Sequence, residues 1–156
     1  MIDITVPGRG SHTIELLILD LNGTISVDGR IVRGVKEKLR RLSEALEITV
    51  VTADTNRNAK SLLAGLPVRI HMIRENRENE QKLAVVLEKG KEHTLSIGNG
   101  CNDVSMLRES AIGICVAGKE GASTEALMAS DLVVSTINDA LDILLKPHRL
   151  RATLRR

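Results

Sequence analysis

The sequence contains no phenylalanine, tyrosine or tryptophan. This absence excludes the aromatic platforms on which many single-strand nucleic-acid-binding proteins stack bases. The core must therefore be aliphatic, and with 42% of its 156 residues hydrophobic the chain can bury one such core. Because this length leaves no room for two ordinary domains, we predict a single domain over residues 1–146.

Cysteine and long apolar runs are also scarce. Cys101 and Cys115 are too few for a disulfide framework, and both fall in segments predicted to be interior, which favours reduced thiols. No apolar run approaches the roughly 18 residues that a membrane-spanning helix needs. The first ten residues lack the basic and apolar regions of a secretion signal. We therefore expect a cytoplasmic protein with no membrane partner.

Neither basic nor acidic residues are in large excess. The 22 basic residues nearly balance the 20 acidic ones, and a net charge of +2 gives no broad basic field, so nucleic acid is not an expected partner. Pro147 is expected to end the last helix and to leave residues 147–156 as a mobile basic tail. Its four arginines are more typical of a solvated tail than of a partner contact. The four histidines are scattered without the spacing of metal ligands.

Short apolar runs alternate with segments of helical period, a pattern typical of a parallel sheet between helices. We predict an α/β, Rossmann-like fold. An N-terminal β-hairpin begins at residues 2–6, turns at 7–11 and leads into the first central strand, and residues 21–32 form a short flap hairpin. The central strands are predicted at 14–19, 48–51, 68–73, 94–97, 111–116 and 132–134. The helices are predicted at 35–46, 56–63, 80–87, 104–109, 124–129 and 137–145.

Polar residues follow three of these strands. They occupy residues 20–24, 52–55 and 98–103, and Lys82 begins the helix that precedes the strand at 94–97. In open parallel sheets, ligands bind beyond the carboxyl ends of the strands, so these side chains are expected to meet at one edge of the sheet.

The residue types at this edge suit phosphate chemistry. The Asp20 carboxylate can attack phosphorus and form an acyl phosphate. Asp20 and Asp103 together can hold Mg²⁺, a hard cation that prefers oxygen ligands. Thr52 can donate a hydrogen bond to a phosphoryl oxygen, and Lys82 can neutralise charge on the nucleophile and on the transferred group.

The order and spacing of these segments resemble the four motifs of the haloacid dehalogenase (HAD) superfamily, over residues 14–145. The phosphorylation domain of P-type ATPases is the most similar: Asp-Leu-Asn-Gly-Thr at 20–24 resembles its Asp-Lys-Thr-Gly-Thr, and Thr-Ala-Asp at 52–54 resembles its Thr-Gly-Asp. The resemblance implies a HAD-type fold and an Mg²⁺ cofactor. It implies a catalytic set of Asp20, Thr52 and Lys82. It also implies a substrate-binding set of Asn22, Gly23, Thr24, Ala53 and Asn102, and a metal-binding set of Asp20, Asn22, Asn99 and Asp103.

Two asparagines depart from the usual phosphatase pattern. Asn22 stands where most HAD phosphatases carry a second aspartate, and an amide cannot supply the roughly 10²- to 10⁴-fold that a general acid/base contributes. Its backbone carbonyl remains available to a metal. Asn99 stands where a metal-binding aspartate is usual, which lowers the charge offered to Mg²⁺. We expect a slow phosphatase with an aspartyl-phosphate intermediate; the alternative is a catalytically weakened domain that binds phosphate and Mg²⁺ to regulate a partner.

The gaps between the motifs are too short for a cap domain, which predicts an open site. Such a site fits a phosphorylated small molecule or a phosphoprotein, or a homo-oligomer in which a neighbouring subunit covers the opening. Two further segments have plainer interpretations. We interpret Asp54 and Asn56 as helix caps in preference to substrate contacts. Residues 118–121 fit a plain loop better than an anion-binding site.

Overall fold

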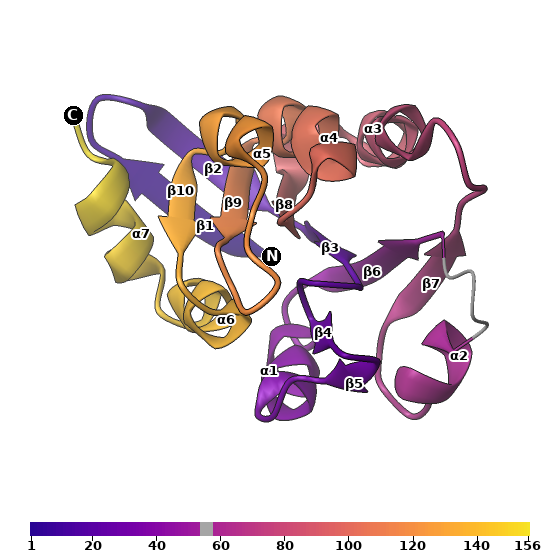
Figure 1. Cartoon of the computed structure of the whole chain (residues 1–156). Coiled ribbons are helices and arrows are strands. Elements are labelled where there is room, and N and C mark those ends of the chain that lie inside the picture. Colours follow the sequence, from indigo (N-terminus) through magenta and orange to yellow (C-terminus); the bar gives the residue numbers. More distant parts are fainter. Residues whose placement is uncertain (54–57) are drawn as a thin grey trace.

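A computed structural model describes residues 1–53 and 58–156 of the chain (Figure 1). Its centre is a six-stranded sheet in which every neighbouring pair of strands is parallel, in the order β10-β9-β8-β3-β6-β7. The strands are β3 (Leu16–Asp20), β6 (Glu47–Thr52), β7 (Arg69–Met72), β8 (Thr94–Gly98), β9 (Ile112–Val116) and β10 (Leu132–Val134). This arrangement confirms the predicted α/β, Rossmann-like fold.

Helices cover both faces of the sheet. One face carries α1 (Val35–Leu42), α2 (Ala59–Leu62) and α6 (Ile137–Leu145), and the other carries α3 (Glu78–Lys89), α4 (Val104–Glu109) and α5 (Thr124–Ala129). The alternation of side chains along a strand divides β3 between the two layers. Leu17 and Leu19 pack in the larger core with α1 and α6, whereas Leu16 and Ile18 pack against α3 and α4.

The N-terminal hairpin is separate from the central strand. It consists of β1 (Ile2–Val6) paired antiparallel with β2 (Gly10–Ile14), and the central strand starts at Leu16. The sequence predicts one strand over residues 14–19, because apolar side chains occupy both the end of β2 and the start of β3. In the structure Ile14 ends the hairpin and faces the larger core.

The segment predicted as a mobile tail forms a helix, α7 (Pro147–Leu154), so that prediction is wrong. Leu150 and Leu154, one turn apart, are both buried in the larger core, and α7 packs against β1. Pro147 occupies the first turn of α7, where a proline needs no N–H partner, so it starts a helix as well as ending one. The arginines dominated the sequence pattern and concealed this apolar pair.

The flap hairpin lies where it was predicted, as β4 (Ser26–Val27) and β5 (Arg30–Ile31). Asp28 and Gly29 both have positive φ at its turn, as tight hairpin turns require. Two short 3₁₀ helices, η1 (Lys91–His93) and η2 (Cys101–Asp103), complete the fold.

No cap domain interrupts the described residues between the motifs, in agreement with the predicted open site. Within residues 1–53 and 58–156, no helix has the length and apolar character to cross a membrane. The predicted caps Asp54 and Asn56 lie outside the described residues.

The sheet order places Asp20 at a topological switch point. β3 lies between β6, which leads to β7, and β8, which leads to β9 and β10, so the chain leaves β3 in opposite directions on its two sides. A crevice forms at the carboxyl end of the strand where such a reversal occurs. Asp20 is the last residue of that strand.

Candidate active site

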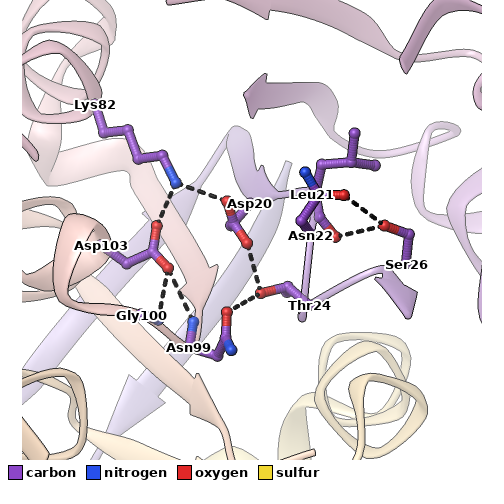
Figure 2. A network of polar contacts seen from close by, with 9 residues as sticks. All are labelled: Asp20, Leu21, Asn22, Thr24, Ser26, Lys82, Asn99, Gly100 and Asp103. Atoms are coloured by element: carbon purple, nitrogen blue, oxygen red, sulfur yellow. Dashed lines mark hydrogen bonds and ion pairs between the residues drawn. The ribbon is translucent and has the colours of Figure 1, made fainter. Parts of the chain in front are cut away.

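Asp20 is the centre of a buried polar network at the end of β3 (Figure 2). It follows Leu16 and Ile18 at even spacing, so its side chain lies on the face covered by α3. Lys82 of α3 is only 1% exposed. Its Nζ lies 2.6 Å from Asp20 Oδ1 and 2.6 Å from Asp103 Oδ1. We call Asp20, Lys82 and Asp103 the carboxylate–lysine cluster.

Asp103 is fully buried, and both of its carboxylate oxygens have protein partners. Oδ1 accepts from Lys82, and Oδ2 accepts from the backbone N–H groups of Asn99 and Gly100, both at 2.9 Å. A Cβ on Gly98 would lie 2.5 Å from Asp103 Cγ, so a glycine is needed for η2 to turn back over β8. Asp103 therefore holds both Lys82 and the loop that starts at Asn99.

Thr24 connects Asp20 to Asn99. Its hydroxyl lies 3.0 Å from Asp20 Oδ2 and 3.2 Å from Asn99 Oδ1, and with one hydrogen it can donate to only one of them at a time. Asn99 in turn donates from Nδ2 to the carbonyl of Gly121 at 3.0 Å. The backbone at Gly23 has φ +80°, and a Cβ there would lie 2.7 Å from Asn99 Nδ2, so glycine is required for this turn.

Burial and charge shift the protonation of the cluster. Burial is the main cause that raises the pKa of Asp20 to about 6; Asp103 adds to the rise, and Lys82 and Thr24 oppose it. For Lys82, burial lowers the pKa, but the attraction of Asp20 and Asp103 outweighs burial, and the pKa rises above its ordinary value. At neutral pH Lys82 is therefore an ammonium, and Asp20, with a pKa of about 6, is mainly ionised.

The structure brings together most of the sequence-predicted residues. Thr52 ends β6, is 3% exposed, and directly follows Val51, which pairs with Asp20. Ala53 follows it and is half-buried. The predicted residues that are bonded to Asp20, directly or through a shared partner, or that pack against those contacts are Asp20, Gly23, Thr24, Lys82, Asn99 and Asp103.

Two predicted residues stand apart from the cluster. The exposed side chain of Asn22 accepts a hydrogen bond from Ser26 at 3.3 Å, so it is turned toward the flap and away from Asp20. Asn102 is exposed on η2 and makes none of the contacts in Figure 2. Any role of Asn22 at the site therefore falls to its backbone.

The donors near Asp20 are oxygens, which suit a hard divalent cation. The described residues contain no group of three or more histidine, cysteine, aspartate or glutamate side chains arranged to hold a metal. Thr24 bridges a carboxylate oxygen of Asp20 and the amide oxygen of Asn99, so two oxygen donors lie near each other. The residues thus fit Mg²⁺, with less charge than a site that has an aspartate at position 99.

Sequence reasoning missed Glu120. Its Oε2 would lie 2.9 Å from a Cβ on Gly23, so its carboxylate lies beside the turn that follows Asp20. Glu120 thus supplies one acidic group near two positions, 22 and 99, where this chain has asparagine in place of the aspartate expected from the resemblance. The signal was present, because Glu120 follows β9 at the same carboxyl edge of the sheet. The loop 118–121 had been interpreted as plain because its glycines and lysine have no motif of their own.

No protein-family model matches the chain. A soluble P-type ATPase-like phosphatase of Methanocaldococcus jannaschii is 26% identical over 140 residues, which cover 87% of this chain and 51% of that protein, so the chain spans about half its length. An uncharacterized protein of the same organism is 46% identical over 82 residues, covering 50% of this chain and 88% of that protein. The human phospholipid-transporting ATPase VD is 50% identical over 52 residues, which cover 33% of this chain and 4% of the ATPase.

Solved structures share the fold. The cobalt-bound deoxy-D-mannose-octulosonate 8-phosphate phosphatase of Haemophilus influenzae superposes with a TM-score of 0.71 at 16% identity, covering 92% of this chain and 94% of that one. The corresponding enzyme of Moraxella catarrhalis, in complex with magnesium, phosphate and 3-deoxy-D-manno-octulosonate, gives a TM-score of 0.59 at 18% identity, covering 89% and 90%. The chain therefore has the fold of these phosphatases, and at 26% identity it resembles a soluble P-type ATPase-like phosphatase.

Proposed function

We propose that the chain is a phosphomonoester hydrolase that uses Mg²⁺ and forms an aspartyl-phosphate intermediate on Asp20. The observation that carries the proposal is the carboxylate–lysine cluster, which presents a buried aspartate at the carboxyl end of β3 beside an ammonium group. The phosphatases with the same fold and the 26%-identical soluble phosphatase support the reaction class.

In the first step an Asp20 oxygen attacks phosphorus, a P–O bond to Asp20 forms, and the P–O bond to the leaving alcohol breaks. Oδ2 is the freer oxygen, because Thr24 can turn its hydrogen to Asn99, whereas Oδ1 is held by Lys82. Lys82 offsets the negative charge that gathers as the phosphoryl group approaches. Thr52, at the end of the adjacent strand, is the proposed donor to a phosphoryl oxygen.

In the second step water attacks phosphorus, the P–O bond to Asp20 breaks, and inorganic phosphate is released. Asn22 can neither protonate the leaving alkoxide nor take a proton from the water, so both protons are exchanged with solvent. The missing general acid/base corresponds to roughly 10²- to 10⁴-fold in rate. Turnover is therefore slow, and the second step, which needs an activated water, is the slower of the two.

Mg²⁺, held by Asp20, Asn99 and the backbone carbonyl of Asn22 with Asp103 behind them, would neutralise phosphoryl charge and orient the group for attack. The cobalt and magnesium ions in the two phosphatase structures support a divalent ion. The proposed substrate is a phosphorylated small molecule or a phosphoprotein in the cytoplasm, with no role for nucleic acid or membrane. A neighbouring copy of the chain could cover the open site.

A second candidate function follows from the asparagines. Because Asn22 faces Ser26 and Asn99 carries no charge, a phosphoryl group on Asp20 would persist, and the domain would serve a partner as a phosphorylated switch. Slow release of phosphate with a stable phosphoenzyme would distinguish this candidate from a phosphatase that turns over steadily.

The test is hydrolysis of 4-nitrophenyl phosphate with and without Mg²⁺. Wild type should release nitrophenol, Asp20→Asn should lose at least about 10³-fold of that rate, and chelation of the metal should stop it. Asp3→Asn, an identical exchange at an exposed position of β1, is the matched control and should retain wild-type turnover. Hydrolysis that survives Asp20→Asn would contradict the proposal.

A further inference from the structure

A cavity of about 560 Å³ is lined in part by Gly23 and Thr24, next to the candidate active site. Its walls come from the flap hairpin β4–β5, the loop after β9 and the start of α6. Five apolar side chains line it: Val27, Ile31, Val32, Val116 and Ile137. This volume lies in the range of small-molecule sites, which are about 300–1,000 Å³.

Three basic residues also line the cavity, Arg30, Arg33 and Lys119, and we call them the cationic rim. Asp28 is the one acidic residue among the described lining residues. Within residues 1–53 and 58–156, no salt bridge joins a cationic-rim side chain to a carboxylate. The lining therefore carries more basic than acidic side chains, and the Glu120 carboxylate lies beside Gly23 at its edge.

Some basic residues elsewhere on the surface do have carboxylate partners. Lys38 contacts Asp142 at 2.8 Å, and Arg69 contacts Glu47 at 2.9 Å. An arginine or lysine that lines a partly apolar cavity without such a partner is well placed to bind a ligand anion, because a charge-assisted hydrogen bond to a guanidinium is about twice as strong as a neutral one.

The cavity adjoins the candidate active site. Gly23 and Thr24 belong to its lining, and Thr24 Oγ1 is 3.0 Å from Asp20 Oδ2. A substrate whose phosphoryl group meets Asp20 can place its remaining atoms in the cavity, with its carbon skeleton against Val116 and Ile137 and its far end at the cationic rim.

We propose that this cavity binds the leaving group of the substrate, and that the substrate is a small phosphomonoester with a second anionic group, a carboxylate or another phosphate, bound by Arg30, Arg33 and Lys119. This inference rests on the proposed function and narrows it. The size of the cavity favours a small molecule over a segment of a phosphoprotein. The positive charge of the cationic rim separates such substrates from phosphates of neutral alcohols.

Paired substrates test the charge requirement. Glycerol 3-phosphate and 3-phosphoglycerate differ in a hydroxymethyl group against a carboxylate, and propane-1,3-diol monophosphate and bisphosphate differ in a hydroxyl against a phosphate. The wild-type kcat/KM should be at least about tenfold higher for the anionic member of one pair or both, as expected for one bond to a charged group. The pair with the larger ratio identifies the second group as carboxylate or phosphate.

Variants locate the effect. Arg30→Gln/Arg33→Gln should reduce the preference for the anionic member to about twofold or less, chiefly by raising the KM for that substrate. Arg151→Gln, on α7 and outside the cavity, is the matched control and should keep the full preference. Lys119→Gln tests the remaining cation in the same way.

The results separate this inference from the proposed function. Asp20-dependent hydrolysis of 4-nitrophenyl phosphate without any preference for anionic substrates, or a higher kcat/KM for a phosphoserine peptide than for all four small phosphates, would overturn the inference and leave the phosphatase intact. If no phosphate is hydrolysed, the inference is tested by the binding of D-glycerate and of glycerol, measured from the chemical shifts of the flap amides. Glycerate that binds no tighter than glycerol would overturn the inference, and tighter binding that Arg30→Gln/Arg33→Gln abolishes would support it.

Discussion

Thr24 contacts the carboxylate–lysine cluster and also lines the cavity that carries the cationic rim, and these two regions handle charge in opposite ways. In the cluster, Asp20, Lys82 and Asp103 are buried, and each charged group is paired with another at 2.6 Å. At the rim, Arg30, Arg33 and Lys119 are exposed and have no salt bridge among the described residues. The charges of the cluster are paired within the protein, whereas the charges of the cationic rim are free to pair with a ligand.

This difference has an energetic consequence. Removing one partner of a buried ion pair leaves an uncompensated charge in a poorly solvated place and strongly destabilises the fold. Removing an exposed, unpaired cation changes the free energy of unfolding by about 0.5 kcal/mol or less. Substitutions in the cluster should therefore alter both stability and chemistry, whereas substitutions at the rim should alter only the choice of ligand.

The largest expected effect on stability is that of Lys82→Met. The variant leaves Asp20 and Asp103 buried without their shared ammonium, and its free energy of unfolding should fall by roughly 3–5 kcal/mol at neutral pH. Urea denaturation measures the loss. Lys119→Met, the same exchange at the cationic rim, should stay within about 0.5 kcal/mol of wild type. Similar losses in the two variants would remove the contrast between the regions.

The next effect is the pH dependence of stability. Folding raises the pKa of Asp20 from 3.8 to about 6, so between these pH values the folded state keeps a proton that the unfolded chain has released. The free energy of unfolding should therefore fall as pH rises from about 4 to about 6, by roughly 3 kcal/mol relative to Asp20→Asn. Urea titrations in the presence of a chelator measure both proteins. Parallel pH profiles for wild type and Asp20→Asn would show that Asp20 does not titrate in this way.

A smaller effect is expected from Asn99→Asp. The variant restores a charged oxygen donor beside Thr24 and Asp20, so the affinity for Mg²⁺ should rise about tenfold. Calorimetric titration of the protein with Mg²⁺ measures the change. Asn102→Asp, an identical exchange on the exposed part of η2, is the control and should leave the affinity near that of wild type. Equal gains in the two variants would indicate general surface charge and not a site at Asn99.

Sequence predicted the sheet well because the rules that govern it are local. Short apolar runs of five or six residues, such as those that form β3 and β6, are readily interpreted as buried strands. The rule that ligands bind at the carboxyl ends of parallel strands then located Asp20 and Thr52. The helix α7 was missed because its stability comes from two leucines that contact β1, a partner almost 150 residues away along the chain. The i, i+4 spacing of these two leucines is a helical signal, but two residues are too few to predict a helix.

The sequence predicted which residues form the site, but it did not predict the hydrogen bonds and ion pairs between them. Motif order identified Lys82 and Asp103, but the sharing of one ammonium by two carboxylates depends on how α3 and η2 meet over β3. The side chain of Asn22 was placed at the site by spacing alone, and its bond to Ser26 depends on the flap turn. Glu120 and the cationic rim depend on loops brought together by the fold.

The most direct test is detection of a phosphoryl group on Asp20. The protein is mixed with 4-nitrophenyl phosphate and Mg²⁺, quenched in acid within seconds, digested and analysed by peptide mass spectrometry. The account predicts that the peptide containing Asp20 gains the mass of one phosphoryl group, and that this gain is absent from Asp20→Asn and present in Asp3→Asn. Nitrophenol release accompanied by no phosphorylated peptide, or by a phosphoryl group on another residue, would contradict it.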